Sequence, residues 1–584
     1  MRSTDQLSLD DALQLLAKQG ALSDKQIAQV RASVNNDDER HPFLRIADLG
    51  LRSSAAPPEP LTAEAITRLV ASASGLEYFR IDPLKIDVES ITSLVSQAYA
   101  TRFQFLPVVV TDAQVTVATA EPYADEWVDE ISRILQRKIV RVLANPRDIE
   151  RYLPEFYGVS RSISGATSRS SASESLVNNF EQLTELGTVG EPDANDQHIV
   201  HLVDWLLQYA FEQRASDIHI EPRRDQSNVR FRIDGVLHLI HQLPTNVVGA
   251  ITSRIKSLGR MDVADKRRPQ DGRVRTKTPA GLEVELRLST MPTTFGEKLV
   301  MRIFDPEKLA QPFEALGFEG DELDQWNQLV EQPHGIVLVT GPTGSGKTTT
   351  LYSALKRLAR PEINVCTIED PIEMVEPQFN QMQVQPTVNI DFASGVRTLL
   401  RQDPDIIMIG EIRDKETADV AIQAALTGHL VLSTLHTNDA PSAVTRLIDI
   451  GVPPFLIGAT LLGVVAQRLV RTLCDACSEQ VTLDRETWAA LARDLPLPTR
   501  ANVPVGCDEC RHTGYRGRQG IYEIMTLDQT LRQMIKPGLQ LDQFKAAAVS
   551  QGLKTLRVSG AQKVAKGTST VDEVLSVVAG DFAN

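Results

Sequence analysis

The sequence lacks the features of a membrane-spanning or secreted chain. It contains no apolar run of about 18 residues, the length that a membrane-spanning helix needs. The nearest approaches are 199–211, which is interrupted by His201 and Asp204, and 453–466, which is short and contains glycines. The first residues, Met-Arg-Ser-Thr-Asp-Gln, lack the apolar core of a signal peptide. We therefore expect a cytoplasmic protein with at most a peripheral contact to a membrane.

Basic charge and cysteine are also scarce. The net charge is -15 and the pI is about 5.3, and no basic stripe interleaved with aromatic residues is found, so a general nucleic-acid binder is disfavoured. Four of the five cysteines form two Cys-x-x-Cys pairs. This pattern indicates a metal site in a reducing compartment, not a disulfide framework. A chain of 584 residues is too long for one core, so we expect about three or four domains.

One phosphate-binding signature is present. Residues 341–349, Gly-Pro-Thr-Gly-Ser-Gly-Lys-Thr-Thr, fit G-x-x-x-x-G-K-[ST] between an expected buried strand at 335–340 and an expected helix at 349–360. Backbone N–H groups of such a loop surround a phosphate chain, and the helix N-terminus adds partial positive charge. We expect Lys347 to reach the β- and γ-phosphates of ATP and Thr348 to hold Mg²⁺. The expected nucleotide-binding residues of the loop are Gly341, Pro342, Thr343, Gly344, Ser345, Gly346, Lys347, Thr348 and Thr349.

Polar residues end three further apolar strands, expected within 364–373, 406–410 and 429–434. Parallel sheets carry their sites at the carboxyl ends of the strands, so this order of motifs predicts a doubly wound core of RecA type.

Two glutamates and two histidines at these strands are candidates for the chemistry of hydrolysis. We expect Glu411 to hold Mg²⁺ directly or through water, and Glu369 to activate the attacking water. A single acid at such a position can also simply cap a helix. His429 and His436 are candidates for sensing the γ-phosphate, with a purely structural role as the alternative.

The cysteine pairs predict a structural metal. Cys474 and Cys477, with Cys507 and Cys510, offer four thiolates for a tetrahedral Zn²⁺ and leave no open coordination position. An iron–sulfur cluster uses the same ligands, but no other redox feature is found in the sequence, which favours zinc. Cys366 lies within an expected buried strand and is interpreted as a core residue.

The rest of the chain divides into segments of different composition. We expect an N-terminal docking or regulatory module at 1–157, with a helical hairpin at 10–34, and then a flexible linker rich in Ser, Gly and Thr at 158–195, which lets the module move. Residues 196–311 are expected to form an α+β domain, and 312–584 the nucleotide-binding domain with a zinc subdomain at about 472–520. Arginines recur on the expected strands of the α+β domain, for which a solvated polar face is the alternative: Arg230, Arg232, Arg287 and Arg302.

Several of these stretches resemble the bacterial secretion ATPases of the GspE, PulE and PilB family, which serve type II secretion and type IV pilus assembly. The four motif boxes correspond to 341–348, 368–373, 400–414 and 427–438, and further matches lie at 215–222, 269–273 and 467–471. The cysteine pairs followed by 514–518 resemble the assembly branch of the family, not the pilus-retraction branch. The resemblance is strong over 196–584 and loose over the first 155 residues.

The resemblance implies an α/β fold: a RecA-like P-loop NTPase core, a preceding α+β domain of PAS-like type, an N-terminal helical and α+β module, and a small zinc-binding subdomain. It implies a homohexameric, Mg²⁺-dependent ATPase on the cytoplasmic face of the inner membrane. Such a motor drives polymerisation of a pilus or pseudopilus through a platform protein of GspF or PilC type.

The resemblance also gives the arginines a role. Arg287 and Arg302 of the preceding domain are expected to close over the nucleotide, which links domain closure to the γ-phosphate. Arginines at other recurrent positions of the family, also expected at the nucleotide, are Arg397, Arg401, Arg413 and Arg518. The N-terminal module lacks the Arg-Leu-Gly signature of relatives that bind cyclic di-GMP, so docking on a membrane-anchored partner of GspL type is favoured for it.

The hypothesis favoured by the sequence is a motor of type II secretion, because Thr349-Thr-Leu-Tyr and the stretch 463–471 are more similar to GspE. A type IV pilus extension motor is the alternative. A DNA-uptake or nucleic-acid motor, and a nucleotide-gated scaffold that hydrolyses poorly, are further hypotheses. No nucleic-acid partner is expected.

Overall fold

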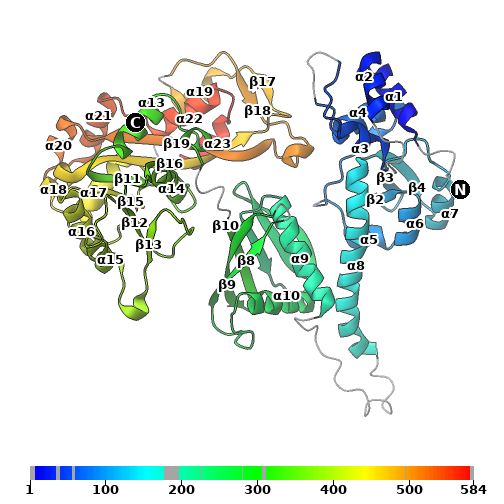
Figure 1. The fold of residues 1–584 in the computed structure, drawn as a ribbon, viewed down its shortest axis with the longest axis horizontal. Coiled ribbons are helices and arrows are strands. Elements are labelled where there is room, and N and C mark those ends of the chain that lie inside the picture. Colours follow the sequence, from blue (N-terminus) through cyan, green and yellow to red (C-terminus); the bar gives the residue numbers. More distant parts are fainter. Residues whose placement is uncertain are drawn as a thin grey trace, which may run out of the picture. The chain divides into compact units, whose positions relative to one another are not determined.

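The fold is known from a computed structural model, which describes residues 7–33, 40–54, 60–83, 85–175, 196–224, 226–278, 281–304, 311–493 and 495–578. The chain divides into two compact units, Met1–Val274 with Arg287–Arg302, and Arg275–Leu286 with Ile303–Asn584 (Figure 1). Among these residues, no helix has both the length and the apolar character that crossing a membrane requires.

The first unit begins with a small helical bundle. Helices α1 (Leu9–Lys18), α2 (Asp24–Ser33), α3 (Pro42–Ala47) and α4 (Ala63–Ser74) enclose a core that includes Leu13, Leu16 and Phe43. Ser8 and Asp11 form a capping box that fixes the start of α1. The expected helical hairpin at 10–34 is confirmed by α1 and α2.

A four-stranded sheet follows, in the order β1-β4-β3-β2. Its strands are β1 (Glu77–Tyr78), β2 (Phe105–Val110), β3 (Gln114–Thr119) and β4 (Lys138–Leu143). Short helices connect them: α5 (Val88–Thr92), α6 (Gln97–Arg102) and α7 (Val128–Leu135). Together with the helical bundle, this sheet confirms the N-terminal helical and α+β module that the family resemblance implies.

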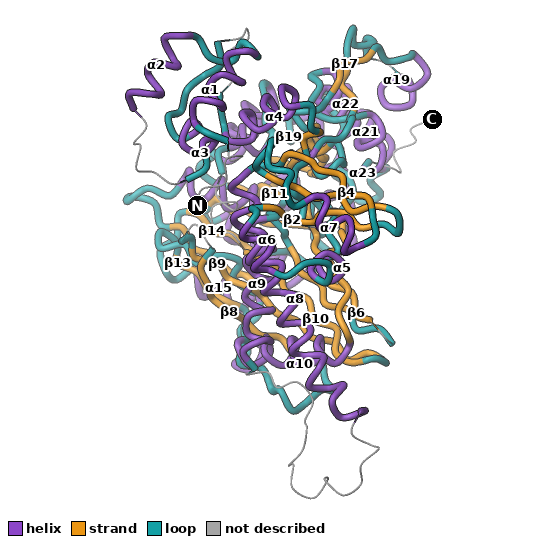
Figure 2. Tube along the Cα trace, turned by 90° about the vertical axis from the view of Figure 1, so that its right-hand side faces the viewer, coloured by secondary structure: helices purple, strands orange, loops and turns teal. Residues whose placement is uncertain are grey.

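Helix α8 (Pro146–Ser175) continues into the segment that was expected to be a linker. Residues 158–175 are helical, because extending an existing helix costs less free energy than starting one. Residues 176–195 lie outside the described residues. The indole N–H of Trp205, on α9 (Gln197–Glu212), donates to Glu155 Oε1 over 2.7 Å, so α8 lies alongside α9 (Figure 2).

The α+β domain, most of which lies in the first unit, is built on a six-stranded sheet of order β7-β6-β5-β10-β9-β8. Alternate residues such as Ile218 and Phe231 are buried, whereas the arginines lie on the other face. Helix α10 (Thr245–Leu258) packs with α9. The strands are β5 (Asp217–Glu221), β6 (Gln226–Ile233), β7 (Val236–Pro244), β8 (Gln270–Lys277), β9 (Glu283–Thr293) and β10 (Gly296–Phe304), with a turn at Asp234-Gly235 between β6 and β7.

The second unit contains a seven-stranded sheet of order β13-β12-β14-β15-β11-β16-β19. Neighbouring strands run parallel from β13 to β16, and β19 is antiparallel to β16. The strands are β11 (Gly335–Thr340), β12 (Val365–Glu369), β13 (Asn380–Gln383), β14 (Ile406–Ile409), β15 (Leu430–Leu435), β16 (Leu461–Leu473) and β19 (Tyr515–Thr526). Every residue of β11 and β15 is buried, as a central parallel strand requires.

Helices cover both faces of this sheet. Alternate residues of β11 enter two different cores: Val337 and Val339 pack with Leu351 of α14, whereas Ile336 and Leu338 belong to the core that includes Ala421 of α16. The helices between the strands are α12 (Phe313–Leu316), α13 (Asp321–Val330), α14 (Lys347–Leu358), α15 (Phe392–Leu399), α16 (Lys415–Leu426), α17 (Ala440–Ile450) and α18 (Pro454–Thr460), with a 3₁₀ turn at Pro386–Val388. The expected doubly wound core of RecA type is confirmed.

A small subdomain lies between β16 and β19. It contains β17 (Glu479–Val481), α19 (Arg485–Ala492), β18 (Ala501–Val503) and a 3₁₀ turn at Asp508–Cys510. After β19 the chain ends in a helical part with α20 (Gln529–Met534), α21 (Leu541–Ser550), α22 (Leu556–Ala565) and α23 (Val571–Val577).

Candidate functional site

The loop at 341–346 joins the buried strand β11 to helix α14, as the sequence predicts. Two of its glycines have backbone angles that side-chain-bearing residues rarely adopt, with φ of +146° at Gly341 and +90° at Gly346. A Cβ at Gly346 would lie 2.7 Å from Nε2 of Gln467, and one at Gly341 would lie 2.5 Å from the carbonyl oxygen of Gln467. The loop therefore needs glycine both for its backbone path and for its close approach to β16.

Lys347 is the first residue of α14, and its ammonium group folds back over the loop. Nζ donates to the carbonyl oxygens of Gly341 over 2.8 Å and Pro342 over 3.1 Å. Burial lowers the pKa of Lys347 to about 8; the carboxylate of Glu411 opposes this shift and the guanidinium of Arg468 adds to it. Lys347 is thus a partly desolvated cation held at the loop.

Glu411 follows β14 at the same edge of the sheet, and its side chain is 15% exposed. It pairs with Arg413, and His436 Nε2 lies 3.5 Å from its Oε2. Burial and the positive charge of Lys347 lower the pKa of His436. The structure therefore brings Lys347, Glu411, Arg413 and His436 together at the carboxyl edge of the sheet. A carboxylate here and the hydroxyl of Thr348 are the oxygen donors that Mg²⁺ prefers.

Glu369 ends β12 and is only 2% exposed. Its Oε2 accepts a 2.6 Å hydrogen bond from the hydroxyl of Tyr352 on α14, and its Oε1 accepts from Thr367 over 2.7 Å and from Gln381 over 3.3 Å. Both oxygens are therefore occupied by donors. An attacking water reaches this carboxylate only by replacing one of them.

His429 lies away from the loop of its own chain. Strand β15 is parallel to β11, and Leu430 is opposite Gly335, so His429 precedes the amino end of β15. The loop follows the other end of β11, roughly 16 Å away at about 3.3 Å per residue. His429 Nδ1 lies 2.9 Å from the carbonyl oxygen of Ala424, near the end of α16. This corrects the expectation that His429 senses the γ-phosphate bound to the same chain.

Of the other arginines expected at the nucleotide in this unit, only Arg413 has a described contact with the acids at the loop edge. Arg397 pairs with Glu416 over 2.8 Å, and Arg401 donates to the carbonyl oxygen of Arg397 over 2.8 Å. The guanidinium group of Arg397 is therefore paired with α16, and that of Arg401 with the end of α15. Arg518 is exposed on β19, opposite Arg471 of β16.

Arg287 on β9 and Arg302 on β10 belong to the other compact unit. Nε of Arg302 donates to Oδ1 of Asp217 over 2.9 Å, while its side chain stays 60% exposed. Arg287 is half-buried. Their expected closure over the nucleotide stays a prediction.

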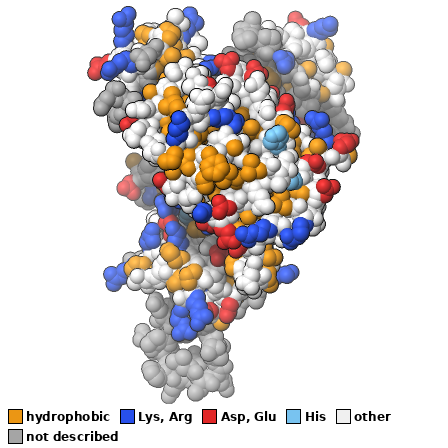
Figure 3. All heavy atoms as spheres, turned by 90° about the vertical axis from the view of Figure 1, so that its left-hand side faces the viewer, with side chains coloured by type: hydrophobic (Ala, Val, Ile, Leu, Met, Phe, Trp, Pro, Cys, Tyr) orange, Lys and Arg blue, Asp and Glu red, His pale blue; other side chains and the backbone are white. Residues whose placement is uncertain are grey.

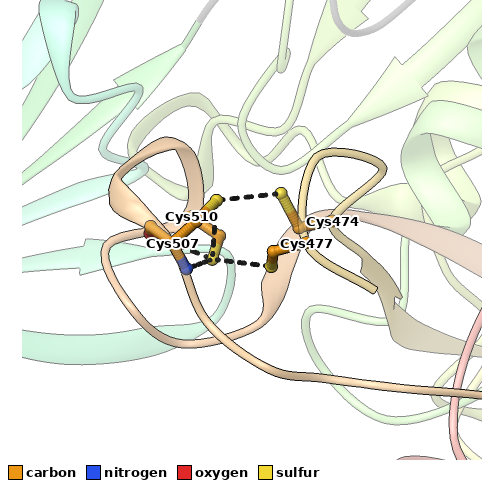
Figure 4. Close-up of side chains that lie close together, drawn as sticks. All are labelled: Cys474, Cys477, Cys507 and Cys510. Carbon is orange, nitrogen blue, oxygen red and sulfur yellow. Dashed lines mark hydrogen bonds between the residues drawn. The ribbon is translucent and has the colours of Figure 1, made fainter. Parts of the chain in front are cut away.

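The four paired cysteines converge, as the sequence predicts (Figure 4). Cys474 follows β16 directly, and the 507–510 pair precedes β19, so the cluster lies at the end of this antiparallel strand pair. Sγ of Cys474 lies 3.8 Å from Sγ of Cys507, and Sγ of Cys477 lies 3.6 Å from Sγ of Cys510. Four sulfurs at about 2.3 Å from a tetrahedral Zn²⁺ are about 3.8 Å apart, so the residues fit the ion.

Backbone N–H groups support these sulfurs. Gly506 donates to Cys477 Sγ over 3.3 Å, and Cys507 and Gly514 donate to Cys510 Sγ over 3.1 and 3.2 Å. Such donors stabilise thiolates, the form that binds metal. Cys366 is a buried residue of β12, as expected.

Sequence reasoning missed several residues that hold the loop and the acids. Tyr352 orients Glu369, and Thr437 and Thr340 join their hydroxyls over 2.8 Å at the start of the loop. Gln467 donates to the carbonyl oxygen of Ser345, and Arg468 donates to that of Asn438. The match of 467–471 to the secretion ATPase family was the one signal in the sequence for these residues, and it indicated no function for them.

Comparison with known proteins agrees with this geometry. The family described as "Type II/IV secretion system protein" matches residues 193–576, and the MshEN domain matches 74–163. The chain is 52% identical to the type IV pilus assembly ATPase TfpB of Acinetobacter baylyi, over 97% of both chains. It is 39% identical to type II secretion system protein E of Xanthomonas campestris pv. campestris, over 83% of this chain and 84% of that one.

The fold is shared with the solved ATPase DotB of Legionella pneumophila. The TM-score is 0.50 at 22% identity, and the match covers 65% of this chain and 95% of DotB. The family match covers residues 193–576, and the similarity to TfpB extends over 97% of both chains. Together they identify the family. The chain belongs to the type II/IV secretion system family of ATPases.

Proposed function

We propose that this protein is a motor ATPase that hydrolyses ATP at the 341–348 loop to power assembly of a type IV pilus. The observation that carries the proposal is the gathering of Lys347, Glu411, Arg413 and His436 around a glycine loop between β11 and α14. The end-to-end similarity to a pilus assembly ATPase supports the pathway. On the strength of that similarity we propose pilus assembly ahead of type II secretion, the hypothesis that the sequence favoured.

In the proposed reaction the loop N–H groups and Lys347 bind the phosphates of ATP. Lys347 exchanges the carbonyl oxygens of Gly341 and Pro342 for phosphate oxygens. Thr348 and Glu411 would hold Mg²⁺, which neutralises charge on the phosphates when bound. Arg413 and His436 flank Glu411 and keep its carboxylate oriented. His436 is also our candidate for contact with the γ-phosphate.

Glu369 is our candidate for activating the attacking water. Its carboxylate accepts hydrogen bonds from Tyr352 and Thr367, and it must exchange one of those donors for the water. Arg287 and Arg302 would supply positive charge from the preceding domain, so that loss of the γ-phosphate opens the domain and produces a stroke.

We further propose that the four cysteines hold a structural Zn²⁺ that fastens the ends of β16 and β19. The thiolates and the N–H groups of Gly506 and Gly514 form a closed site without an open position for chemistry.

The motor is proposed to act as a homohexamer on the cytoplasmic face of the inner membrane. Figure 3 shows apolar side chains gathered in the view that it draws. Among the described residues, Phe455 on α18 and Leu426 on the adjoining α16 are large apolar side chains that are 72% and 58% exposed. Exposed apolar patches mark contacts with other proteins. In this proposal a GspF- or PilC-like platform protein receives the stroke, and the N-terminal module docks on a membrane-anchored cytoplasmic partner of GspL type. Arg397, Arg401 and Arg518 are proposed to face neighbouring subunits.

Type II secretion is the second candidate function, supported by the similarity to type II secretion system protein E. Deletion of the gene in its own host, with complementation by wild type and by Lys347→Ala, separates the two. Loss of surface pili that only the wild-type gene restores supports pilus assembly. Normal pili with loss of exported enzymes would move the proposal to type II secretion, and an unaltered host in both assays would refute both.

A further inference from the structure

Gln467 lies on β16 directly behind the phosphate loop, and both ends of its side chain are engaged. It is 2% exposed. Its Nε2 donates to the carbonyl oxygen of Ser345 over 2.8 Å, and its Oε1 accepts from the hydroxyl of Thr350 over 2.8 Å. A single side chain thus joins the loop, the first turn of α14 and the neighbouring strand.

The orientation of this amide follows from its partners. A backbone carbonyl only accepts hydrogen bonds, so the NH₂ end of Gln467 must face Ser345. The oxygen end is then left for Thr350, whose hydroxyl can donate. This reasoning fixes the amide without relying on the placement of its nitrogen and oxygen atoms.

The hydrogen bond to Ser345 also sets the direction of the next N–H group. In a trans peptide the carbonyl oxygen and the following N–H point in opposite directions. Holding the Ser345 carbonyl toward β16 therefore turns the N–H of Gly346 away from β16. A phosphate-binding loop needs its N–H groups turned inward and its carbonyls turned away.

The glycine at 346 is part of the same contact. A Cβ there would lie 2.7 Å from Nε2 of Gln467, closer than a side chain tolerates. The second fixed glycine of the loop signature is thus matched to the glutamine behind it. The atom that a Cβ would meet is the same Nε2 that donates to Ser345.

We propose that Gln467 is a positioning residue for nucleotide binding: it holds the Ser345–Gly346 peptide with its N–H available to phosphate, and Thr350 holds the Gln467 side chain. The inference rests on the proposed function, in which the loop at 341–348 binds ATP. It extends the proposed binding site by a residue that supports the loop without contacting the nucleotide.

The test uses the purified full-length chain with Mg²⁺, and measures equilibrium binding of the fluorescent nucleotide mant-ADP together with steady-state ATP hydrolysis. Gln467→Met keeps the size of the side chain and removes both hydrogen bonds. We expect Kd for mant-ADP and KM for ATP to rise about tenfold, as the loss of one aligning hydrogen bond implies, with kcat within about twofold. Gln467→Glu should bind more weakly still, because a carboxylate cannot donate to Ser345 and repels phosphate.

A second pair of variants tests the same contact from α14. Thr350→Val removes the donor and should weaken mant-ADP binding in the same direction, whereas Thr350→Ser keeps the hydroxyl and should bind as wild type does. If Gln467→Met does not fold, the two Thr350 variants alone test the proposal. Unchanged binding in both Gln467→Met and Thr350→Val would overturn the proposal, as would equal losses in Thr350→Val and Thr350→Ser.

Lys347→Ala separates this inference from the proposed function. If wild type binds mant-ADP and Lys347→Ala does not, the loop is the nucleotide site and the Gln467 variants are judged on their own. If wild type binds no mant-ADP, the proposed function fails and the role of Gln467 fails with it.

Discussion

The hydroxyl of Tyr352 donates a 2.6 Å hydrogen bond to Oε2 of Glu369, and both side chains are buried. Burial and the neighbouring carboxylate raise the pKa of Tyr352, so the phenol stays protonated and can only donate to this acid. The bond connects helix α14, which begins at the phosphate loop, with the end of β12. A movement of α14 therefore changes the position of a hydrogen-bond donor to Glu369.

The first prediction concerns this acid. Glu369→Gln should lower kcat by about 10²–10⁴, the usual contribution of a general base. Tyr352→Phe keeps the carboxylate and should leave kcat within about tenfold, while lowering the melting temperature because a buried carboxylate loses a donor. Steady-state hydrolysis and calorimetry measure the two effects. Glu376→Gln, on the nearby loop, is the matched control and should behave as wild type. A Glu369→Gln variant with wild-type kcat would leave the acid a structural role only.

The second prediction is a pH dependence of nucleotide binding. The pKa of Lys347 is lowered to about 8 without nucleotide, so the ammonium is mostly charged at pH 7 and mostly neutral at pH 9. Phosphate binds the charged form, so above pH 8 binding requires uptake of a proton. The affinity for mant-ADP should therefore fall by up to about tenfold per pH unit above pH 8. Lys347→Arg stays charged over this range and should lose the dependence. A similar fall in Lys347→Arg would assign the effect to another group.

The third prediction concerns the metal. Elemental analysis of the purified chain should find about one Zn per chain, and Cys474→Ser/Cys507→Ser should lose it. Cys366→Ser is the control, because this thiol lies on β12 outside the cluster, and it should keep the zinc. Iron in place of zinc would support the iron–sulfur alternative, and a wild-type protein that folds without any metal would contradict the site.

The fourth prediction concerns a buried ion pair in the α+β domain. Lys256 is fully buried, and its Nζ donates to Glu297 over 2.7 Å and to the carbonyl oxygen of Asp265 over 2.9 Å. Lys256→Met should cost about 3–5 kcal/mol of unfolding free energy, because it leaves Glu297 buried without its partner.

The double variant Lys256→Met/Glu297→Leu should recover most of that loss, since neither charge then stays buried. Chemical denaturation measures all three proteins. Lys277→Met breaks the exposed pair with Glu283 in the same domain and should change stability by no more than about 1 kcal/mol. A double variant as unstable as the single one would contradict this account of the pair.

Much of the core was predictable from local patterns. Strand β11 begins and ends at the residues that the apolar run at 335–340 predicts, and the glycine loop follows it directly. The cysteine cluster was predictable because ligand spacing within each pair is itself a local pattern. The glycine signature, the strand before it and the helix after it are each recognised from neighbouring residues, and each local preference matches the structure that the fold requires there.

The parts that were missed depend on long-range geometry. His429 was placed at the nucleotide because it borders an apolar strand, but which end of a strand faces the loop follows from the direction of its neighbours. Gln467 is far from Ser345 in sequence, so their hydrogen bond has no local signal. The helical path of 158–175 was missed because composition alone does not show that an existing helix continues through a serine-rich segment.

The fifth prediction tests the central claim most directly. The measurement is the steady-state rate of ATP hydrolysis by the purified full-length chain with Mg²⁺, compared with the rates of the Lys347→Ala and Glu411→Ala variants. Lys347→Ala removes the cation of the loop and Glu411→Ala removes the acid beside it, so both should lose at least about 10²-fold in kcat/KM. Lys277→Met, which changes an exposed lysine at the end of strand β8 in the α+β domain, should retain the wild-type rate. A wild-type rate no faster than that of the two loop-edge variants would contradict the account of this protein as a motor.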